Sequence, residues 1–311
     1  MKRYDWLGPE LARNVRLSRV RVNEPMAAHT SFGIGGPADL LAEPASGEEL
    51  SAILAFARRG AVPYVTIGLG TNILVRDGGF RGLVIKMTGF RELTALCSEG
   101  SEGRLRAGAG LPLHAVADYA ANLGLAGLEF AGGIPGTLGG AVVMNAGAYG
   151  GEMSQVVEDC VVVAGDGASC RLARPELGFG YRVSAIRQDQ IVVEAVLRLN
   201  SASPEAILQR MADYRQRRER SQPLAARSAG SVFRRPHGHY AGALIEGAGL
   251  KGRRVGDAEV SSQHAGFIIN RGEATAADVL ALMESVREAV RGASGVELEP
   301  EIRIIGDDVL Q

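Results

Sequence analysis

The chain lacks several features that each define a broad class of protein. Its 34 Lys and Arg residues are balanced by 35 Asp and Glu residues, so it lacks the bulk positive charge with which many proteins bind nucleic acid. It has no apolar run near the roughly 20 residues that a membrane span needs, and residues 1–6 lead into no apolar signal segment. Its three cysteines, Cys97, Cys160 and Cys170, form no C-x-x-C pair, which favours a reduced chain. We therefore expect a cytoplasmic protein that binds neither nucleic acid nor a membrane.

Two common phosphate-binding motifs and the usual zinc spacings are also missing. No G-x-x-x-x-G-K-[S/T] sequence occurs, which argues against a P-loop ATPase or kinase. The glycine turn at 68–70 is not the Rossmann fingerprint, because Ile73 stands where the third glycine belongs. The histidines show no zinc spacing with the cysteines. His237 and His239 are compatible with a metal site, but a polar loop is the more frequent meaning of such a pair, and we predict no metal.

Glycine is the residue that the chain has in excess. It provides 42 of the 311 residues, nearly twice the average share of about 7%. The glycines cluster in loops without a fixed period, so collagen-like and linker interpretations fail. Eight of them fall within residues 132–151. Because glycine costs about 0.5–1 kcal/mol relative to alanine in regular structure, this density favours bare backbone that lies against a ligand, such as a flat ring system with a phosphate tail. The alternative is a loop-rich bend.

The glycine turn at 68–70 follows an apolar segment and is open to two interpretations. Successive backbone N–H groups in such a turn form a nest that suits a pyrophosphate. A tight turn with no ligand is the commoner meaning of this spacing.

Apolar periodicity predicts a mixture of helices and strands. Helices are expected at 48–60, 113–123, 204–220 and 276–291. Strands are expected at 64–67, 83–85, 104–110, 156–163, 190–199 and 301–305. The helix at 204–220 carries five arginines, Arg210, Arg215, Arg217, Arg218 and Arg220. Its basic face is either solvated or holds an anionic ligand, and the sequence favours neither.

Eight segments in order resemble the motifs of one enzyme family. They are 30–38 (TSFGIGGPA), 68–75 (GLGTNILV), 132–141 with 145–150 (GGIPGTLGGA and NAGAYG), 179–182 (FGYR), 230–233 (GSVF), 248–252 (AGLKG), 264–270 (HAGFIIN) and 298–303 (LEPEIR). Each motif alone is weak, but eight in sequence are specific. From about residue 23 to residue 306 the chain resembles the UDP-N-acetylmuramate dehydrogenase family, also called UDP-N-acetylenolpyruvoylglucosamine reductase.

The resemblance implies an α+β flavoprotein with a two-lobed FAD-binding domain of the vanillyl-alcohol-oxidase (PCMH) type and a C-terminal α+β substrate domain. The expected ranges are 1–85 and 86–200 for the two FAD-binding lobes, 201–300 for the substrate domain, and 301–311 for a strand that returns to the FAD-binding region. The implied reaction uses NADPH and FAD to reduce the enolpyruvyl double bond of UDP-N-acetylglucosamine enolpyruvate, which gives UDP-N-acetylmuramate for peptidoglycan synthesis. The substrate is thus a UDP-sugar, and we expect a monomer.

The resemblance also implies which residues hold the flavin. They are Gly68, Leu69, Gly70, Thr71, Asn72, Gly132, Gly133, Ile134, Pro135, Gly136, Gly139, Gly140, Asn145, Ala146, Gly147, Ala148 and Tyr149. No histidine or cysteine lies within residues 64–74, so we expect the FAD to be bound noncovalently.

Three catalytic residues carry over from the family motifs: Arg182, Ser231 and Glu301. Hydride delivery to an enolpyruvyl group leaves negative charge beside a carboxylate, which calls for a cation there and a proton donor at the neighbouring carbon. Arg182 would stabilise the charge, Glu301 would assist at the same end, and Ser231 would donate the proton. The implied substrate-binding residues are Tyr181, Arg182, Ser231, Lys251, His264, Asn270 and Glu301. Taken singly, such residues are more often surface or turn residues.

The chain departs from the family pattern at three places. Gly33 stands where the family usually has arginine, and Arg234 and Arg235 replace the usual Lys-Asn pair before Pro236. Only a short turn, 184–190, separates Arg182 from the next strand, so the substrate-capping insertion of one subtype is absent.

Two other functions remain open at this point. The first is another FAD-dependent oxidoreductase on the same scaffold, such as an alcohol or sugar oxidase. The second is a nucleotide-binding module without turnover.

Overall fold

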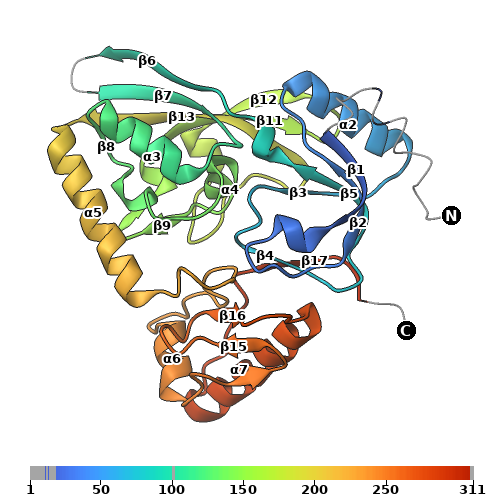
Figure 1. Cartoon of the computed structure of the whole chain (residues 1–311). Helices are drawn as coiled ribbons and strands as arrows, with labels where there is room; N and C mark the ends of the chain where they lie inside the picture. Colours follow the sequence, from blue (N-terminus) through green and yellow to red (C-terminus); the bar gives the residue numbers. More distant parts are fainter. Residues whose placement is uncertain (1–10, 12, 14–18, 100–101, 309–311) are drawn as a thin grey trace. The chain divides into compact units, whose positions relative to one another are not determined.

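The computed structural model describes residues 11, 13, 19–99 and 102–308 (Figure 1). The chain divides into two compact units. Unit 1 comprises residues 1–22, 40–69 and 82–218, and unit 2 comprises residues 23–39, 70–81 and 219–311. The chain therefore passes between the units more than once. The four domain ranges inferred from the sequence follow chain order instead, and they stay a prediction.

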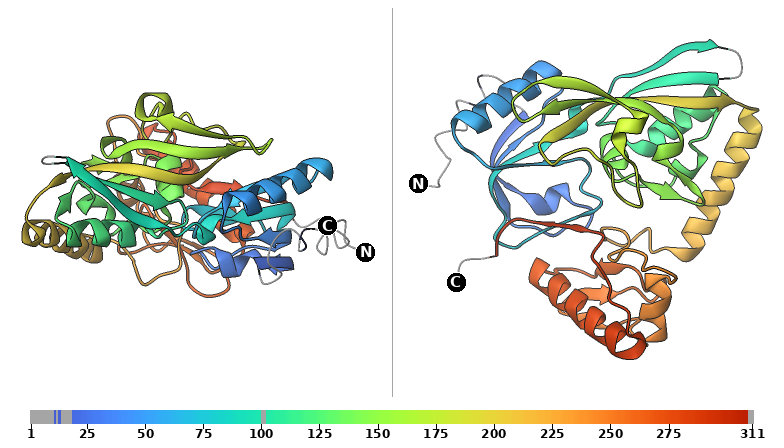
Figure 2. Two further views of the ribbon diagram at one scale, coloured as in Figure 1. Left: turned by 90° about the horizontal axis from the view of Figure 1, so that it is seen from above. Right: turned by 180° about the vertical axis from the view of Figure 1, so that it is seen from behind.

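The larger sheet of unit 1 has the strand order β12-β11-β13-β7-β6, and β8 also pairs with β13. Its strands are β6 (Leu93–Glu99), β7 (Glu102–Gly108), β8 (Leu125–Ala126), β11 (Val157–Ala164), β12 (Ser169–Ala173) and β13 (Gln190–Ser201). Two helices, α3 (Leu113–Asn122) and α4 (Leu138–Val143), lie on one face of this sheet (Figures 1 and 2). Neighbouring strands of this sheet all run antiparallel. The sheet and the two helices enclose one hydrophobic core.

A β-bulge lets this sheet contribute to two cores of unit 1. Val161 pairs with Glu194, but Val162 pairs with Val192, so Val193 is the extra residue on β13. A bulge reverses the side to which the following side chains point. Leu197 accordingly packs in the core with α3 and α4, whereas Val193 packs in a second core with α2 (Gly47–Arg59).

The second core of unit 1 forms between α2 and a four-stranded sheet. The sheet has the order β1-β2-β5-β3, with β1 (Val20–Pro25), β2 (Pro37–Ala42), β5 (Phe80–Lys86) and β3 (Tyr64–Ile67). The division between the units falls inside β1, β2 and β5. Helix α2 begins after Ser46, whose hydroxyl accepts a hydrogen bond from Glu49 N–H, and ends at Gly60. The predicted helix at 48–60 is confirmed.

Unit 2 is built around α7 (Ala276–Ser294), which packs with α6 (Ala241–Gly247) and a three-stranded antiparallel sheet. That sheet consists of β14 (Arg254–Val255), β15 (Ala258–Val260) and β16 (Ile268–Asn270). Thr275 and Asp278 form a capping box at the start of α7. The carboxylate of Asp77 also accepts hydrogen bonds from Ala276 N–H and Ala277 N–H. The 70–81 segment is thereby tied to the helix.

A second, parallel pair in unit 2 joins β4 (Ile73–Val75) to β17 (Arg303–Ile305). The strand predicted at 301–305 therefore exists but begins two residues later. The remaining elements are the long helix α5 (Pro204–Ser221), the short strands β9 (Gly147–Ala148) and β10 (Gly151–Glu152), and the 3₁₀ turns Met26–His29, Met87–Gly89, Glu129–Ala131, Met153–Gln155 and Arg174–Leu177. Among the residues that the structure describes, no helix has the length and apolar content to cross a membrane.

The glycine-dense segment at 132–151 differs from its sequence interpretation. The glycine density predicts loop backbone here, either against a ligand or as a bend. In the structure α4 lies inside it, and Leu138, Ala141 and Val142 are buried in the core of unit 1. The interpretation was wrong on this point because a helix of six residues, all of them small or apolar, is too short to show periodicity.

The two cysteine thiols that the structure describes are expected to differ in reactivity. Cys160 is fully buried, and burial raises its pKa to about 12, whereas Cys170 on the edge strand β12 is exposed. Since the thiolate is the reactive form, iodoacetamide at pH 8 should alkylate Cys170 in the native protein and Cys160 only after unfolding. Peptide mass spectrometry of native and urea-treated protein measures both sites. Equal labelling of the two in the native state would contradict the burial of Cys160.

Candidate active site

In unit 1 the first glycine turn meets the start of α4. A Cβ at Gly68 would overlap the Oγ1 atom of Thr137 and lie 3.0 Å from its Cγ2 atom. Thr137 is the N-cap of α4, and its hydroxyl accepts a hydrogen bond from Gly140 N–H at 3.4 Å. Two segments that the sequence predicted to hold the flavin, 68–69 and 132–140, therefore lie side by side. Any side chain at position 68 would push the start of α4 aside.

The glycines of the second segment fall into two groups. Gly133, Gly140 and Gly150 are exposed, and a Cβ at Gly150 would meet nothing within 4 Å. Other glycines are explained by packing within the protein: a Cβ at Gly139 would lie 2.8 Å from Ala109 Cβ, and one at Gly147 would lie 2.6 Å from the carbonyl oxygen of Gly151. The glycine density thus serves close packing within the protein as well as exposed backbone.

One face of α5 covers this segment. Met211 lies against Gly132, where a Cβ would be 2.7 Å from the methionine Cε atom. Three residues further along, Tyr214 stacks on Tyr149 with ring centroids 4.4 Å apart and an interplanar angle of 8°. The helix therefore holds the glycine segment by apolar and aromatic contacts.

The arginines of α5 divide between packing and solvent. Arg210 pairs with the buried carboxylate of Glu129 at 3.0 Å. Arg218 lies against Gly133 and is partly buried, and this burial lowers the pKa of its guanidinium. Arg215 and Arg217 are exposed. Part of the basic face thus has a structural role, which the sequence did not reveal.

Arg182 occupies the corner of a tight turn. The turn is closed by two backbone hydrogen bonds between Gly180 and Val183. Arg182 has a φ of 55°, which is uncommon for any residue with a side chain. Its Nη2 atom donates to the carbonyl oxygen of Gly147 at 3.1 Å, and its guanidinium lies 5.3 Å from the centre of the Tyr181 ring. The predicted catalytic arginine therefore contacts the predicted flavin segment.

In unit 2 the chain brings Ser231 and Glu301 together. Glu301 N–H donates to the carbonyl oxygen of Val232 at 2.7 Å, the residue next to Ser231. The side chain of Asn72 donates to the carbonyl oxygen of Glu301 at 3.3 Å. Ser231 is exposed and Glu301 is half-buried. Two of the three predicted catalytic residues, and one predicted flavin residue, are thus neighbours along a short backbone ladder.

His264 and Lys251 lie close to this ladder. Ser231 forms a β-bridge with Phe267, and the ring of Phe267 packs edge-on against His264 at 5.1 Å. His264 Nδ1 accepts a hydrogen bond from Gly266 N–H at 3.1 Å, so the proton of the neutral ring is on Nε2. Burial lowers the pKa of His264, and the nearby charge of Lys251 lowers it further, whereas hydrogen bonding to the backbone and the charge of Glu246 act in the opposite direction. The neutral, donor form of His264 is therefore favoured.

Asn270 is used by the protein itself. It is buried, its amide donates to the carbonyl oxygen of Phe32 at 3.0 Å, and its side-chain oxygen accepts from Gly272 N–H at 3.0 Å and Ala274 N–H at 3.1 Å. These bonds fold the loop that leads into α7. Its substrate-binding role stays a prediction.

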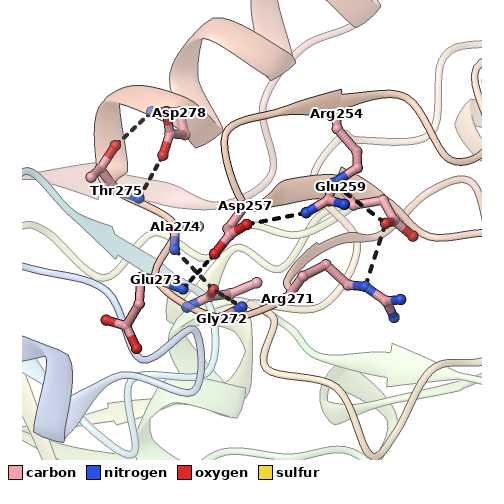
Figure 3. Close-up of polar contacts among 10 residues, drawn as sticks. Arg254, Asp257, Glu259, Arg271, Gly272, Glu273, Ala274, Thr275 and Asp278 are labelled. Carbon is pink, nitrogen blue, oxygen red and sulfur yellow. Dashed lines mark hydrogen bonds and ion pairs between the residues drawn. The ribbon is translucent and has the colours of Figure 1, made fainter.

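Charged side chains hold the other side of the same loop (Figure 3). Asp257 accepts from Glu273 N–H at 2.9 Å and from Arg254 at 3.1 Å. The buried Glu259 lies 3.4 Å from the Nε atom of Arg271 and 3.8 Å from that of Arg254. These contacts tie the 270–275 loop to β14 and β15 and to the turn between them.

Arg227 occupies the space next to Gly33, the position that departs from the family pattern. Gly33 has a φ of 65°, and a Cβ there would lie 3.0 Å from Cδ and 3.4 Å from Nη1 of Arg227. Arg227 Nη1 also donates to the carbonyl oxygen of Gly272 at 3.4 Å. A guanidinium is therefore present beside position 33, although it comes from another part of the sequence.

Several contributors to the site were missed at the sequence level. Thr137 had a readable signal, because a threonine before a helix is a common N-cap. Met211 and Tyr214 also had one, since they share a helix face. Arg227 had none, because nothing in its local sequence links it to Gly33. Among the described residues, no group of three or more His, Cys, Asp or Glu side chains is arranged to hold a metal ion.

Two family models match the chain. A model described as FAD binding domain matches residues 38–173, and one described as the C-terminal domain of UDP-N-acetylenolpyruvoylglucosamine reductase matches residues 222–305. The open glycine backbone of the first region and the first of these models together define an FAD-binding protein.

Relatives and a solved structure fix the family. Proteins named UDP-N-acetylenolpyruvoylglucosamine reductase from Clostridium botulinum (strain Hall) and Clostridium tetani are 47% identical over 94% of both chains and 44% identical over 100% of both chains. A crystal structure of the reductase of that name from Thermus caldophilus has a TM-score of 0.79 at 39% identity, covering 92% of this chain and 100% of that chain. The chain belongs to the UDP-N-acetylenolpyruvoylglucosamine reductase family. The family and the α+β FAD-binding fold inferred from the sequence are confirmed.

The contact between Gly68 and Thr137 makes a testable prediction for flavin binding. In Gly68→Ala the new methyl group displaces the N-cap of α4, so the variant should purify with a several-fold lower ratio of FAD to protein. The 450 nm to 280 nm absorbance ratio measures it. Gly47→Ala is the matched control, because a Cβ there meets nothing within 4 Å. A Gly68→Ala protein with full flavin content would show that the 68–69 turn does not hold the cofactor.

Proposed function

We propose that the protein is an NADPH-dependent, FAD-mediated reductase that converts UDP-N-acetylglucosamine enolpyruvate to UDP-N-acetylmuramate in peptidoglycan precursor synthesis. The observation that carries the proposal is the match over 94–100% of the chain to relatives of this name. The neighbouring positions of Ser231 and Glu301, and the contact of Arg182 with the 145–149 segment, support it.

The residues of unit 1 fit a flavin. Exposed residues Gly133, Gly140 and Gly150, and the lack of room for any side chain at Gly68, are compatible with a flat ring and a phosphate tail that lie against bare backbone. The residues proposed to hold FAD are those of segments 68–72, 132–136, 139–140 and 145–149. Bound FAD supplies the hydride transfer, and the protein supplies orientation and charge.

The side chains of this chain would handle the charge and the proton. Reduction of the enolpyruvyl group places negative charge next to the substrate carboxylate. Arg182 stabilises that charge because a guanidinium stays protonated at any working pH. Glu301 assists at the same end, and the exposed hydroxyl of Ser231 gives its proton to the neighbouring carbon. Tyr181, Lys251, His264 and Asn270 complete the proposed substrate site.

The remaining features of the proposal concern assembly and location. The reductant is NADPH, the FAD is noncovalent, and the protein acts as a monomer in the cytoplasm without the substrate-capping insertion. The two FAD-binding lobes are proposed at 1–85 and 86–200, with a substrate domain at 201–300 and the returning strand at 301–311.

A two-step anaerobic titration tests the proposal. NADPH should bleach the flavin absorbance at 450 nm, and addition of UDP-N-acetylglucosamine enolpyruvate should then restore it with formation of UDP-N-acetylmuramate. An FAD-dependent alcohol or sugar oxidase would instead be reduced by its own substrate and reoxidised rapidly by oxygen. A colourless protein that binds only a nucleotide would exclude both enzymes.

Ser231→Ala separates the two half-reactions. Bleaching by NADPH should stay near the wild-type rate, whereas reoxidation by the enolpyruvyl substrate should slow by about 100- to 10,000-fold, the usual contribution of a general acid. Stopped-flow absorbance at 450 nm measures each step. Reoxidation within about twofold of wild type would remove Ser231 from the mechanism.

A further inference from the structure

Three hydrogen bonds from side chains join the 143–147 segment to the 180–184 turn. Ser184 Oγ donates to the carbonyl oxygen of Val143 at 2.9 Å, Asn145 Nδ2 donates to that of Gly180 at 3.0 Å, and Arg182 Nη2 donates to that of Gly147 at 3.1 Å. All of these residues belong to unit 1. Donors from both segments take part, so neither segment can move without breaking bonds made by the other.

Asn145 is the central and most enclosed member of this set. Its exposed fraction is 1%. Its side-chain oxygen accepts a hydrogen bond from Ser154 N–H at 2.8 Å while its amide nitrogen donates to Gly180. The two partners fix which way the amide points, because one is a donor and the other an acceptor. A buried amide with its bonds made on both sides is held in one position.

Each of the two segments joined by these bonds contains a residue in an uncommon backbone conformation. Asn145 has a φ of 41° and Arg182 a φ of 55°. Asparagine tolerates this left-handed region, but an arginine there is disfavoured by roughly 1 kcal/mol or more. Such a conformation persists only where surrounding bonds impose it. The turn is closed at Gly180, the residue whose carbonyl oxygen Asn145 binds.

We propose that Asn145 is a positioning residue for Arg182. Its amide holds the carbonyl of Gly180, which fixes the strained turn and aims the guanidinium across Gly147. The side chain thus faces the arginine turn, so the part of Asn145 in the proposed flavin site is left to its main chain. The consequence for catalysis rests on the proposed function, whereas the geometric claim does not.

The geometric claim is tested by crystal structures of the wild-type and Asn145→Gly holoenzymes. Glycine adopts a φ of 41° without strain, so this variant removes the amide and leaves the backbone free to keep its conformation. We expect the bond between Arg182 Nη2 and Gly147 to be lost and the 180–183 turn to shift. An unchanged Arg182 in the variant would overturn the proposal, whatever reaction the enzyme catalyses.

The kinetic claim is tested by the split between the half-reactions. In Asn145→Gly, reoxidation by the enolpyruvyl substrate should fall by about 10- to 100-fold, because a displacement of about 1 Å in a substrate-positioning group has effects of that size. Bleaching by NADPH and the FAD content should fall much less. If flavin content and bleaching fall as far as reoxidation, the side chain of Asn145 holds the cofactor and the proposal is wrong.

The Asn145→Asp variant adds a measurement, the pH dependence of reoxidation, that would not change if Asn145 had a purely structural role. Aspartate keeps the acceptor for Ser154 N–H, but its ionised carboxylate faces the carbonyl of Gly180 without a proton to donate. The protonated acid can donate again. The reoxidation rate of Asn145→Asp, relative to wild type, should therefore recover as the pH is lowered, and that of Asn145→Gly should not. The absence of this recovery together with reoxidation within twofold of wild type would overturn the proposal.

Thr275→Ala is the control for lost stability. It removes the N-cap of α7 in unit 2 and should lower stability by about 1 kcal/mol, with both half-reactions unchanged.

A wild-type enzyme that is bleached by NADPH but not reoxidised by the enolpyruvyl substrate would refute the proposed function alone, because the crystal structures still decide the position of Arg182.

Discussion

Backbone segments in this protein approach one another so closely that a β-carbon has no room. In unit 1, Gly68 lies against Thr137 and Gly139 against Ala109. In unit 2, a Cβ at Gly36 would overlap the carbonyl oxygen of Asp77, whose carboxylate caps α7. The turn that precedes β4, the start of α4 and the entry to α7 all depend on these approaches. These loops can therefore approach one another only where the residue is glycine. The conformational entropy that glycine loses on folding is offset by burial of the hydrophobic cores of the two units.

The sequence predicted those parts of the fold that rest on periodicity and end signals. Helix α2 has acidic residues at its start and Gly60 at its end, and β3 is a compact apolar run, so both were located closely. Helix α4 and strands β14, β15 and β16 escaped prediction because they span only two to six residues. Strand β15 is stabilised by pairing with β14 on one side and β16 on the other, and segments of two or three residues are too short to show a strand pattern in the sequence.

The sequence predicted which residues belong to the candidate site better than it predicted the contacts that hold them in place. Residue types at motif positions indicated Arg182, Ser231 and Glu301, but only the folded chain shows that Glu301 bonds to the neighbour of Ser231. The burial of Asn270 and Asn145 was likewise hidden, since an asparagine in a motif reads equally as a ligand contact or as a brace for the backbone. In the structure, the hydrogen-bond partners of each amide show that both side chains bind the protein backbone.

The contact between Gly33 and Arg227 makes the two positions sterically interdependent. Arginine restored at 33 would have to share its volume with the side chain already there, and it would also need the left-handed backbone that Gly33 now adopts. Loss of Arg227 would remove the guanidinium that now lies beside position 33. A side chain at position 33 is therefore compatible with this arrangement only if Arg227 moves aside or is replaced.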